Sequence, residues 1–368
     1  MSLHLLQRAP RNADLGTLHL TFFVTAIATE LGIRTQLYLT HYPQLGGHGL
    51  HIAHLLWGGV FMVGALAILL SLLGRRARQV AALLAGVGFG FFIDELGKFI
   101  TADNDYFYKP AAGLIYLIFI GLYLGSRAYQ RHRGLDEDEK VRNAVELIGE
   151  ATRGPFKQEY RDRALALLAD VAPTHPLREQ LVALAEGIDT TPNPDPPWFR
   201  RFADVVAARY RAWSEQPWFH RVVIVVFAGW ALAGALLVLG LVLSVTFQDN
   251  AARPGFEQDS VAHLNFLNVA SLGSTAVSCV LVAIGMERLW RGDRLEAYAW
   301  FTRALLVSIF ITRVFTFVES QFGAAFGLAI DVAMLISIQL MTAQERRRHP
   351  ARPAPHRPAD ESAAPAPG

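Results

Sequence analysis

Apolar runs of about 20 residues recur along this chain, and they constrain its fold more than any other feature. A helix of that length crosses a hydrocarbon core of about 30 Å. With 52% hydrophobic residues, 18% charged residues and a mean hydropathy of +0.27, the chain is too apolar for an ordinary soluble domain. We therefore predict an all-α, polytopic membrane protein of about eight transmembrane helices, at residues 17–39, 51–73, 80–101, 111–124, 222–245, 263–286, 298–318 and 322–341.

The positions of the arginines predict the topology. A net charge of +2 gives no reason to expect a nucleic-acid partner, so position matters more than the total. With eight spans, the arginine-rich loops fall on one side, and the alternate loops carry only Lys109 and Arg253. By the positive-inside rule we expect both termini to be cytoplasmic. The loops concerned contain Arg75, Arg76 and Arg78; Arg127, Arg131 and Arg133; Arg288, Arg291 and Arg294; and Arg346, Arg347 and Arg348.

Changes in composition divide the chain into four parts. We predict a first membrane half at 1–128, a cytoplasmic helical insert with a proline-rich linker at 129–196, an interfacial helix with the second half at 197–343, and a disordered tail at 344–368. The insert is small for an independent core, so we expect it to lean on the membrane part or to bind a cytoplasmic protein. The two four-helix halves have the same orientation, which leaves an internal duplication open.

Charged side chains interrupt the apolar runs at one level, toward the outer side. Ionisable groups inside a membrane are costly and mark functional sites. By helical spacing, Asp94 pairs with Lys98 four residues on, whereas Glu95 points about 100° away and lacks a local partner. Either these groups bind an ion, or they form ion pairs that only orient helices, with Glu95 meeting Arg313 or Arg34. The predicted binding and ion-coupling residues are Glu30, Asp94, Glu95, Lys98, Arg313 and Glu319.

Three histidines before the second span form a candidate metal site. His48, His51 and His54 are three residues apart, so on a continuous helix they share a face. With Asp94 or Glu95 nearby they would offer the nitrogen and oxygen ligands that suit zinc or iron. The alternative is a hydrogen-bonding helix start at the membrane interface. The single cysteine, Cys279, excludes a cysteine cluster within one chain.

Small residues predict close helix packing in two spans. Gly86, Gly88 and Gly90 alternate in the third, where they let neighbouring helices approach. Ser271, Ser274 and Ser278 lie three to four residues apart in the sixth, which also favours packing.

The segment around Asp94 carries a resemblance. GFGFFIDELGKF at 88–99, continuing to DNDYF at 103–107, resembles a signature of uncharacterised bacterial multi-pass integral membrane proteins. The resemblance covers the first membrane half; it implies a location in the bacterial plasma membrane and implies no activity.

Three functions stay open on the sequence alone. The first is transport, or ion- or proton-coupled binding of a small solute, at an outward-facing polar site. The second is a metal-dependent membrane enzyme acting at the outer leaflet, whose catalytic residues are unknown. The third is a membrane scaffold whose insert binds a partner.

Overall fold

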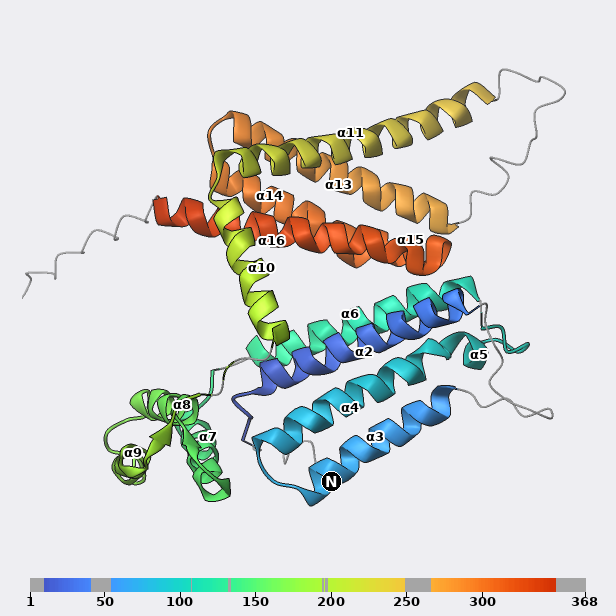
Figure 1. The fold of residues 1–368 in the computed structure, drawn as a ribbon. Coiled ribbons are helices and arrows are strands. Elements are labelled where there is room, and N and C mark those ends of the chain that lie inside the picture. The colour runs from blue at the N-terminus through green and yellow to red at the C-terminus, as the bar shows by residue number, and fades with distance from the viewer. Residues whose placement is uncertain are drawn as a thin grey trace, which may run out of the picture. The chain divides into compact units, whose positions relative to one another are not determined.

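A computed structural model of the chain describes residues 10–40, 54–106, 108–131, 134–193, 195, 198–248 and 266–348. These parts are almost entirely helical, and the two strands have two residues each. Seven stretches are long and apolar enough to cross a membrane. The prediction of an all-helical protein built from apolar helices of membrane length is confirmed (Figure 1).

Two compact units make up the chain, and the first comprises Met1–Arg201 with Arg313–Ala325. Its apolar core joins Ala26, Ile93, Ile115 and Phe119 from three different helices. The membrane-length helices are α2 (Leu15–Leu39), α3 (His54–Ser71), α4 (Arg75–Asp94) and α6 (Lys109–Arg131), and the shorter elements beside them are α5 (Leu96–Ile100), α15 (Arg313–Ser320) and the 3-10 turn η3 (Gln321–Gly323).

The insert of this unit has its own small core. The aspartate Asp136 caps the first helix, because its side chain accepts from the backbone of Glu139 while the Glu139 carboxylate accepts from the backbone of Asp136. Val141, Tyr160 and Leu168 are buried in the core beneath. The elements are α7 (Glu137–Gly149), η1 (Glu150–Arg153), β1 (Phe156–Lys157), α8 (Gln158–Ala169), α9 (Arg178–Gly187) and β2 (Thr190–Thr191), with β1 and β2 pairing in parallel.

The second unit comprises Phe202–Thr312 and Phe326–Gly368. Its core is the stack of Phe227 on Phe301, with ring centroids 4.8 Å apart, beside Val282, Ile338 and Met341. Its helices are α10 (Trp198–Ser214, of which the first residues belong to the first unit), α11 (Pro217–Gln248), α13 (Phe266–Trp290), α14 (Arg294–Val307), the π-helical segment η2 (Ser308–Thr312) and most of α16 (Ala324–Arg348).

Two predicted boundaries are wrong. The third span is not one helix, because α4 ends at Asp94 and α5 begins at Leu96. The disordered tail was expected from residue 344, but α16 continues to Arg348. The reason is that Glu345 is buried and lies 3.7 Å from Arg294, which holds this turn in place. The rest of the four-part division stays a prediction.

The alternating glycines of α4 lie in close contact with two neighbouring helices, as predicted from their small size. A Cβ on Gly88 would lie 2.7 Å from the carbonyl oxygen of Gly58 on α3. A Cβ on Gly90 would lie 2.6 Å from the carbonyl oxygen of Ala26 on α2, and Gly86 meets the same helix. Residues two apart point to opposite sides of a helix, so one alternating run admits α2 and α3 at backbone contact.

We expect Gly88→Ala to lower the free energy of unfolding by about 1–3 kcal/mol, because the methyl group overpacks the contact with α3. Gly64→Ala on α3 is the matched control, since its Cβ meets nothing within 4 Å. Thermal unfolding of both variants in detergent measures the difference. Equal stability of the two variants would contradict the close contact.

Candidate functional site

A break in the α4–α5 segment places two carboxylates at one point. Glu95 lies between the two helices, with φ −88° and ψ 9°, and its carbonyl accepts from the backbone of Lys98 at 3.0 Å. Asp94 and Glu95 are both fully buried. Since α4 has 20 residues it is about 30 Å long, so the break lies about one membrane thickness from its arginine-rich start.

Asp94 pairs with an arginine of another helix. The Arg34 Nε of α2 lies 2.6 Å from the Asp94 Oδ1, and Arg34 Nη2 donates to the Asp94 carbonyl at 2.8 Å. The Tyr106 hydroxyl donates to the same carboxylate, at 2.8 Å from Oδ2. The Arg34 guanidinium also lies over the rings of Tyr106 and Phe322, at 4.2 and 4.8 Å from their centroids. The Asp94 charge is therefore paired and hydrogen-bonded, as a buried charge requires.

The loop after α5 brings Tyr106 into place. Asn104 adopts a left-handed conformation with φ 55°, which a small polar side chain tolerates. The Thr101 hydroxyl accepts from the backbone of Asp105 at 2.8 Å, and the Asp105 carbonyl approaches Gly97 so closely that a Cβ there would lie 2.8 Å away. The loop thus folds back over α5.

Glu95 has weaker partners than Asp94. Its Oε1 accepts from the backbone N–H of His54 at 2.6 Å, and it lies 3.4 Å from Lys98 Nζ and 3.5 Å from His54 Nδ1. Its Oε2 is buried and has no hydrogen-bond partner among the described residues. One oxygen of this buried carboxylate is therefore left to receive a proton or a cation.

Glu30 resembles Glu95 in this respect. It is 3% exposed, and its nearest cation is Arg34 Nε at 3.8 Å, one helical turn further along α2. Its Oε1 is buried and accepts no hydrogen bond from the described residues. Arg34 Nε lies closer to the Asp94 carboxylate, at 2.6 Å, than to that of Glu30, at 3.8 Å. Glu30 therefore shares its cation with Asp94.

We call this set the Glu95 cluster. The ionisable groups joined by these contacts in the described part of the chain are three carboxylates, one arginine, one lysine, one histidine and one tyrosine. Counting every carboxylate as ionised and the histidine as neutral, the formal charge of the set is −1. An uncompensated buried charge is costly, so in that state the set would be stabilised by one proton or one cation. The members are Glu30, Arg34, His54, Asp94, Glu95, Lys98 and Tyr106.

The pairing differs from the one expected from helical spacing. Asp94 was predicted to meet Lys98, but it pairs with Arg34, and Glu95 meets Lys98 instead. The cause is the break at Glu95, which interrupts the regular i to i+4 geometry after Asp94.

The structure brings four of the six predicted binding residues together: Glu30, Asp94, Glu95 and Lys98. The other two, Arg313 and Glu319, lie on α15, where Arg313 is half-buried and Glu319 is exposed. That helix packs on α6 through the stack of Phe317 on Tyr116, 4.5 Å between centroids.

One of the three histidines of the metal prediction lies among the described residues. His54 belongs to the cluster, while His48 and His51 lie outside the described residues. In the described part of the chain, no three His, Cys, Asp or Glu side chains are arranged to hold a metal ion. The zinc or iron site stays a prediction.

Sequence reasoning missed several polar residues. Arg34 was expected to pair with Glu30 or Glu95 and not with Asp94, and Tyr106 was not considered, although it lies in the DNDYF segment. In the second unit, Ser308 donates to Asp331 at 2.8 Å, and both are buried where the helix becomes π-helical. Asp331 was visible as the one acid inside residues 322–341.

Comparison of the chain with protein-family models, curated proteins and solved structures finds no match in any of the three. The geometry of the site is therefore the basis for its interpretation.

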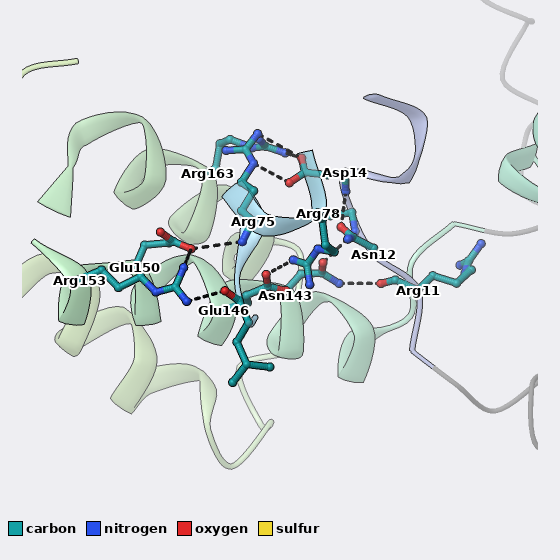
Figure 2. A network of polar contacts seen from close by, with 12 residues as sticks. Arg11, Asn12, Asp14, Arg75, Arg78, Asn143, Glu146, Glu150, Arg153 and Arg163 are labelled. Atoms are coloured by element: carbon teal, nitrogen blue, oxygen red, sulfur yellow. Dashed lines mark hydrogen bonds and ion pairs between the residues drawn. The ribbon is translucent and has the colours of Figure 1, made fainter. Parts of the chain in front are cut away.

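A second polar network lies where α4 begins and holds the insert (Figure 2). Arg75 and Arg163 lie 2.7 and 2.6 Å from the Asp14 carboxylate, and Arg78 pairs with Glu146. The network encloses a cavity of only about 10 Å³. The insert therefore docks on the membrane helices of its own unit through ion pairs. A cytoplasmic protein partner for it stays a prediction.

Glu139, on α7 of the insert, forms an ion pair with Arg11. Arg11 donates to both of its oxygens from the side chain, at 3.1 and 3.0 Å. These bonds lower the pKa of Glu139 from 4.5 to about 2. Because the folded pKa is the lower one, this stabilisation is fully present above pH 4.5 and is lost as the pH falls toward 2.

Glu139→Gln should reduce the loss of thermal stability between about pH 6 and about pH 3, because the amide does not titrate. Glu137→Gln removes an exposed acid of the same helical turn and should keep the loss seen in the parent protein. Unfolding midpoints of each variant at both pH values provide the measurement. An identical pH dependence in all three proteins would refute the assignment.

For the Glu95 cluster, we expect Arg34→Met to destabilise the protein by about 3–5 kcal/mol, because Asp94 is left as an unpaired buried charge. The double variant Arg34→Met with Asp94→Leu should recover much of that loss, since no buried charge remains at this pair. A double-mutant cycle on unfolding in detergent measures the interaction. Additive losses would show that the two side chains do not depend on each other.

Proposed function

We propose that this protein is a multi-pass protein of the bacterial plasma membrane that takes up a proton or small cation at the Glu95 cluster and couples it to the movement of a small solute. The observation that carries the proposal is the buried Glu95 Oε2, which has no hydrogen-bond partner among the described residues and lies in a cluster of three carboxylates. Ionisable groups at this depth mark ion and proton pathways.

The break in the helix supports the same function. Broken helices at membrane depth occur where the backbone lines a binding site, and transporters use them for substrates and coupling ions. Here the break carries Glu95 itself. His54 and Lys98 lie beside it, so a proton or cation arriving at Glu95 changes the pairing of both.

The helix lengths support eight crossings. The longest apolar stretch, Arg294–Arg347, has 54 residues and would be about 80 Å long as one helix, far more than one crossing needs. The turn at Gln321–Gly323, where Gln321 has φ 49°, divides it into two helices of membrane length. Eight crossings place both termini and the insert on the arginine-rich, cytoplasmic side. We also propose that the chain belongs to the group of bacterial multi-pass membrane proteins that it resembles in the segment ending in DNDYF.

Glu95→Gln should abolish uptake of the proton or cation while preserving the fold, because the amide keeps the shape of the side chain without its charge. In membranes reconstituted with purified protein, the infrared band of a protonated carboxyl group should appear with falling pH in the parent and be lost in the variant. Asp103→Asn removes an exposed acid of the following loop and should leave the band unchanged.

The coupling is tested separately by proteoliposome flux. A pH or sodium gradient should drive uptake of at least one of a panel of amino acids, sugars and inorganic anions in the parent but not in Glu95→Gln. A band that survives in Glu95→Gln would overturn the site. A normal band with no flux across the panel would overturn transport and leave the binding site standing.

A further inference from the structure

At the start of α4, an apolar groove with an arginine rim lies between α3, α4 and the insert. Its volume is about 280 Å³, near the lower end for small-molecule sites. Ile68 and Leu72 line it from α3 and the residues after it, and Val80 lines it from α4. Arg76 and Arg153 are its two cations.

The two arginines differ from the others nearby. Arg75 and Arg78 are engaged by carboxylates, whereas Arg76 is exposed and forms no ion pair with any residue that the structure describes. Arg153 donates to the carbonyl of Leu73 and lies 4.0 Å from Glu150, yet about half of its side chain is exposed. Guanidinium donors therefore remain available at the mouth of the groove.

The apolar floor is open to the outside of the helices. Leu72, Leu73 and Val80 are 57%, 84% and 50% exposed, at the ends of two helices of membrane length. On such helices an exposed apolar surface faces lipid tails, while the arginines mark the headgroup level. An amphiphile with an acyl chain and an anionic head matches both features.

We infer that this groove binds an anionic phospholipid of the cytoplasmic leaflet, with its phosphate on Arg76 and Arg153 and an acyl chain along Leu72 and Val80. Planar guanidinium groups suit phosphate oxygens, and basic pockets between membrane helices on the cytoplasmic side bind anionic headgroups. The inference rests on the proposed topology and is independent of the Glu95 cluster.

The lipid would have a structural consequence. Arg76 belongs to α4 and Arg153 to the insert, so one phosphate bridges the two. Gly74 lies between them with φ +99°, where a Cβ would lie 2.5 Å from the Arg153 guanidinium. The bound lipid thus adds to the ion pairs that dock the insert, and it makes docking depend on the charge of the leaflet.

Native mass spectrometry of the full-length protein in neutral detergent tests this. Phosphatidylglycerol should bind more tightly than phosphatidylcholine with the same acyl chains, and Arg76→Gln with Arg153→Gln should weaken its binding roughly fivefold for each arginine. The matched control, Arg127→Gln with Arg142→Gln, removes one exposed arginine from a membrane helix and one from the insert, away from the groove. It should keep the parent affinity.

Three results would overturn the inference. They are equal binding of the two lipids, equal loss in the groove and control variants, and displacement of the lipid by soluble glycerol phosphate at matched concentration, which would assign the site to a free phosphate compound. Size-exclusion elution and thermal unfolding confirm that each variant is folded. Should the groove variant fail to fold, Arg76→Gln alone is compared with Arg127→Gln, and unchanged lipid affinity would again overturn the inference.

Discussion

The ion pair between Arg34 and Asp94 is the interaction on which the first unit depends where α4 ends. A bare carboxylate at this depth costs several kcal/mol, so Asp94 is tolerated only with a cation and donors around it. Arg34 supplies the cation at 2.6 Å, and the Tyr106 hydroxyl supplies a donor. The ring of Phe322, in the turn after α15, covers the guanidinium. One charge therefore fixes α2, the end of α4, the following loop and a distant turn.

This pair also separates two interpretations of the buried charges. Charges that only orient helices should be fully matched, and Asp94 with Arg34 satisfies that condition. Glu95 and Glu30 do not, because each has a buried oxygen without a hydrogen-bond partner among the described residues. Asp94 therefore fits the structural interpretation, whereas Glu95 and Glu30 are the carboxylates on which the proposed binding depends.

The apolar runs predicted the helices well, because a membrane imposes length and hydropathy at once. The same reasoning failed at Glu95, since a single non-helical residue leaves no mark in the hydropathy of a span. Spacing rules then assigned Lys98 to Asp94, whereas the break assigns it to Glu95. The partner from α2 could be suspected from charge alone, but choosing between Asp94 and Glu95 required the packing of helices. The contact of Tyr106 with Asp94 could not be predicted for another reason, because it depends on how the loop after α5 folds back over that helix.

Helix α4 meets a network at each end, which limits how the site can work. Its start is held by Arg75 and Arg78, its end by Asp94, and its middle by glycines at backbone contact with α2 and α3. Sliding α4 by one residue, about 1.5 Å, would break contacts at both ends and force backbones together. Under the proposed function, α5 is the element that can adjust with the least loss of contacts, because it has five residues and begins at the break. A proton or cation bound at Glu95 would then displace α5 and its loop, while α4 would keep its position.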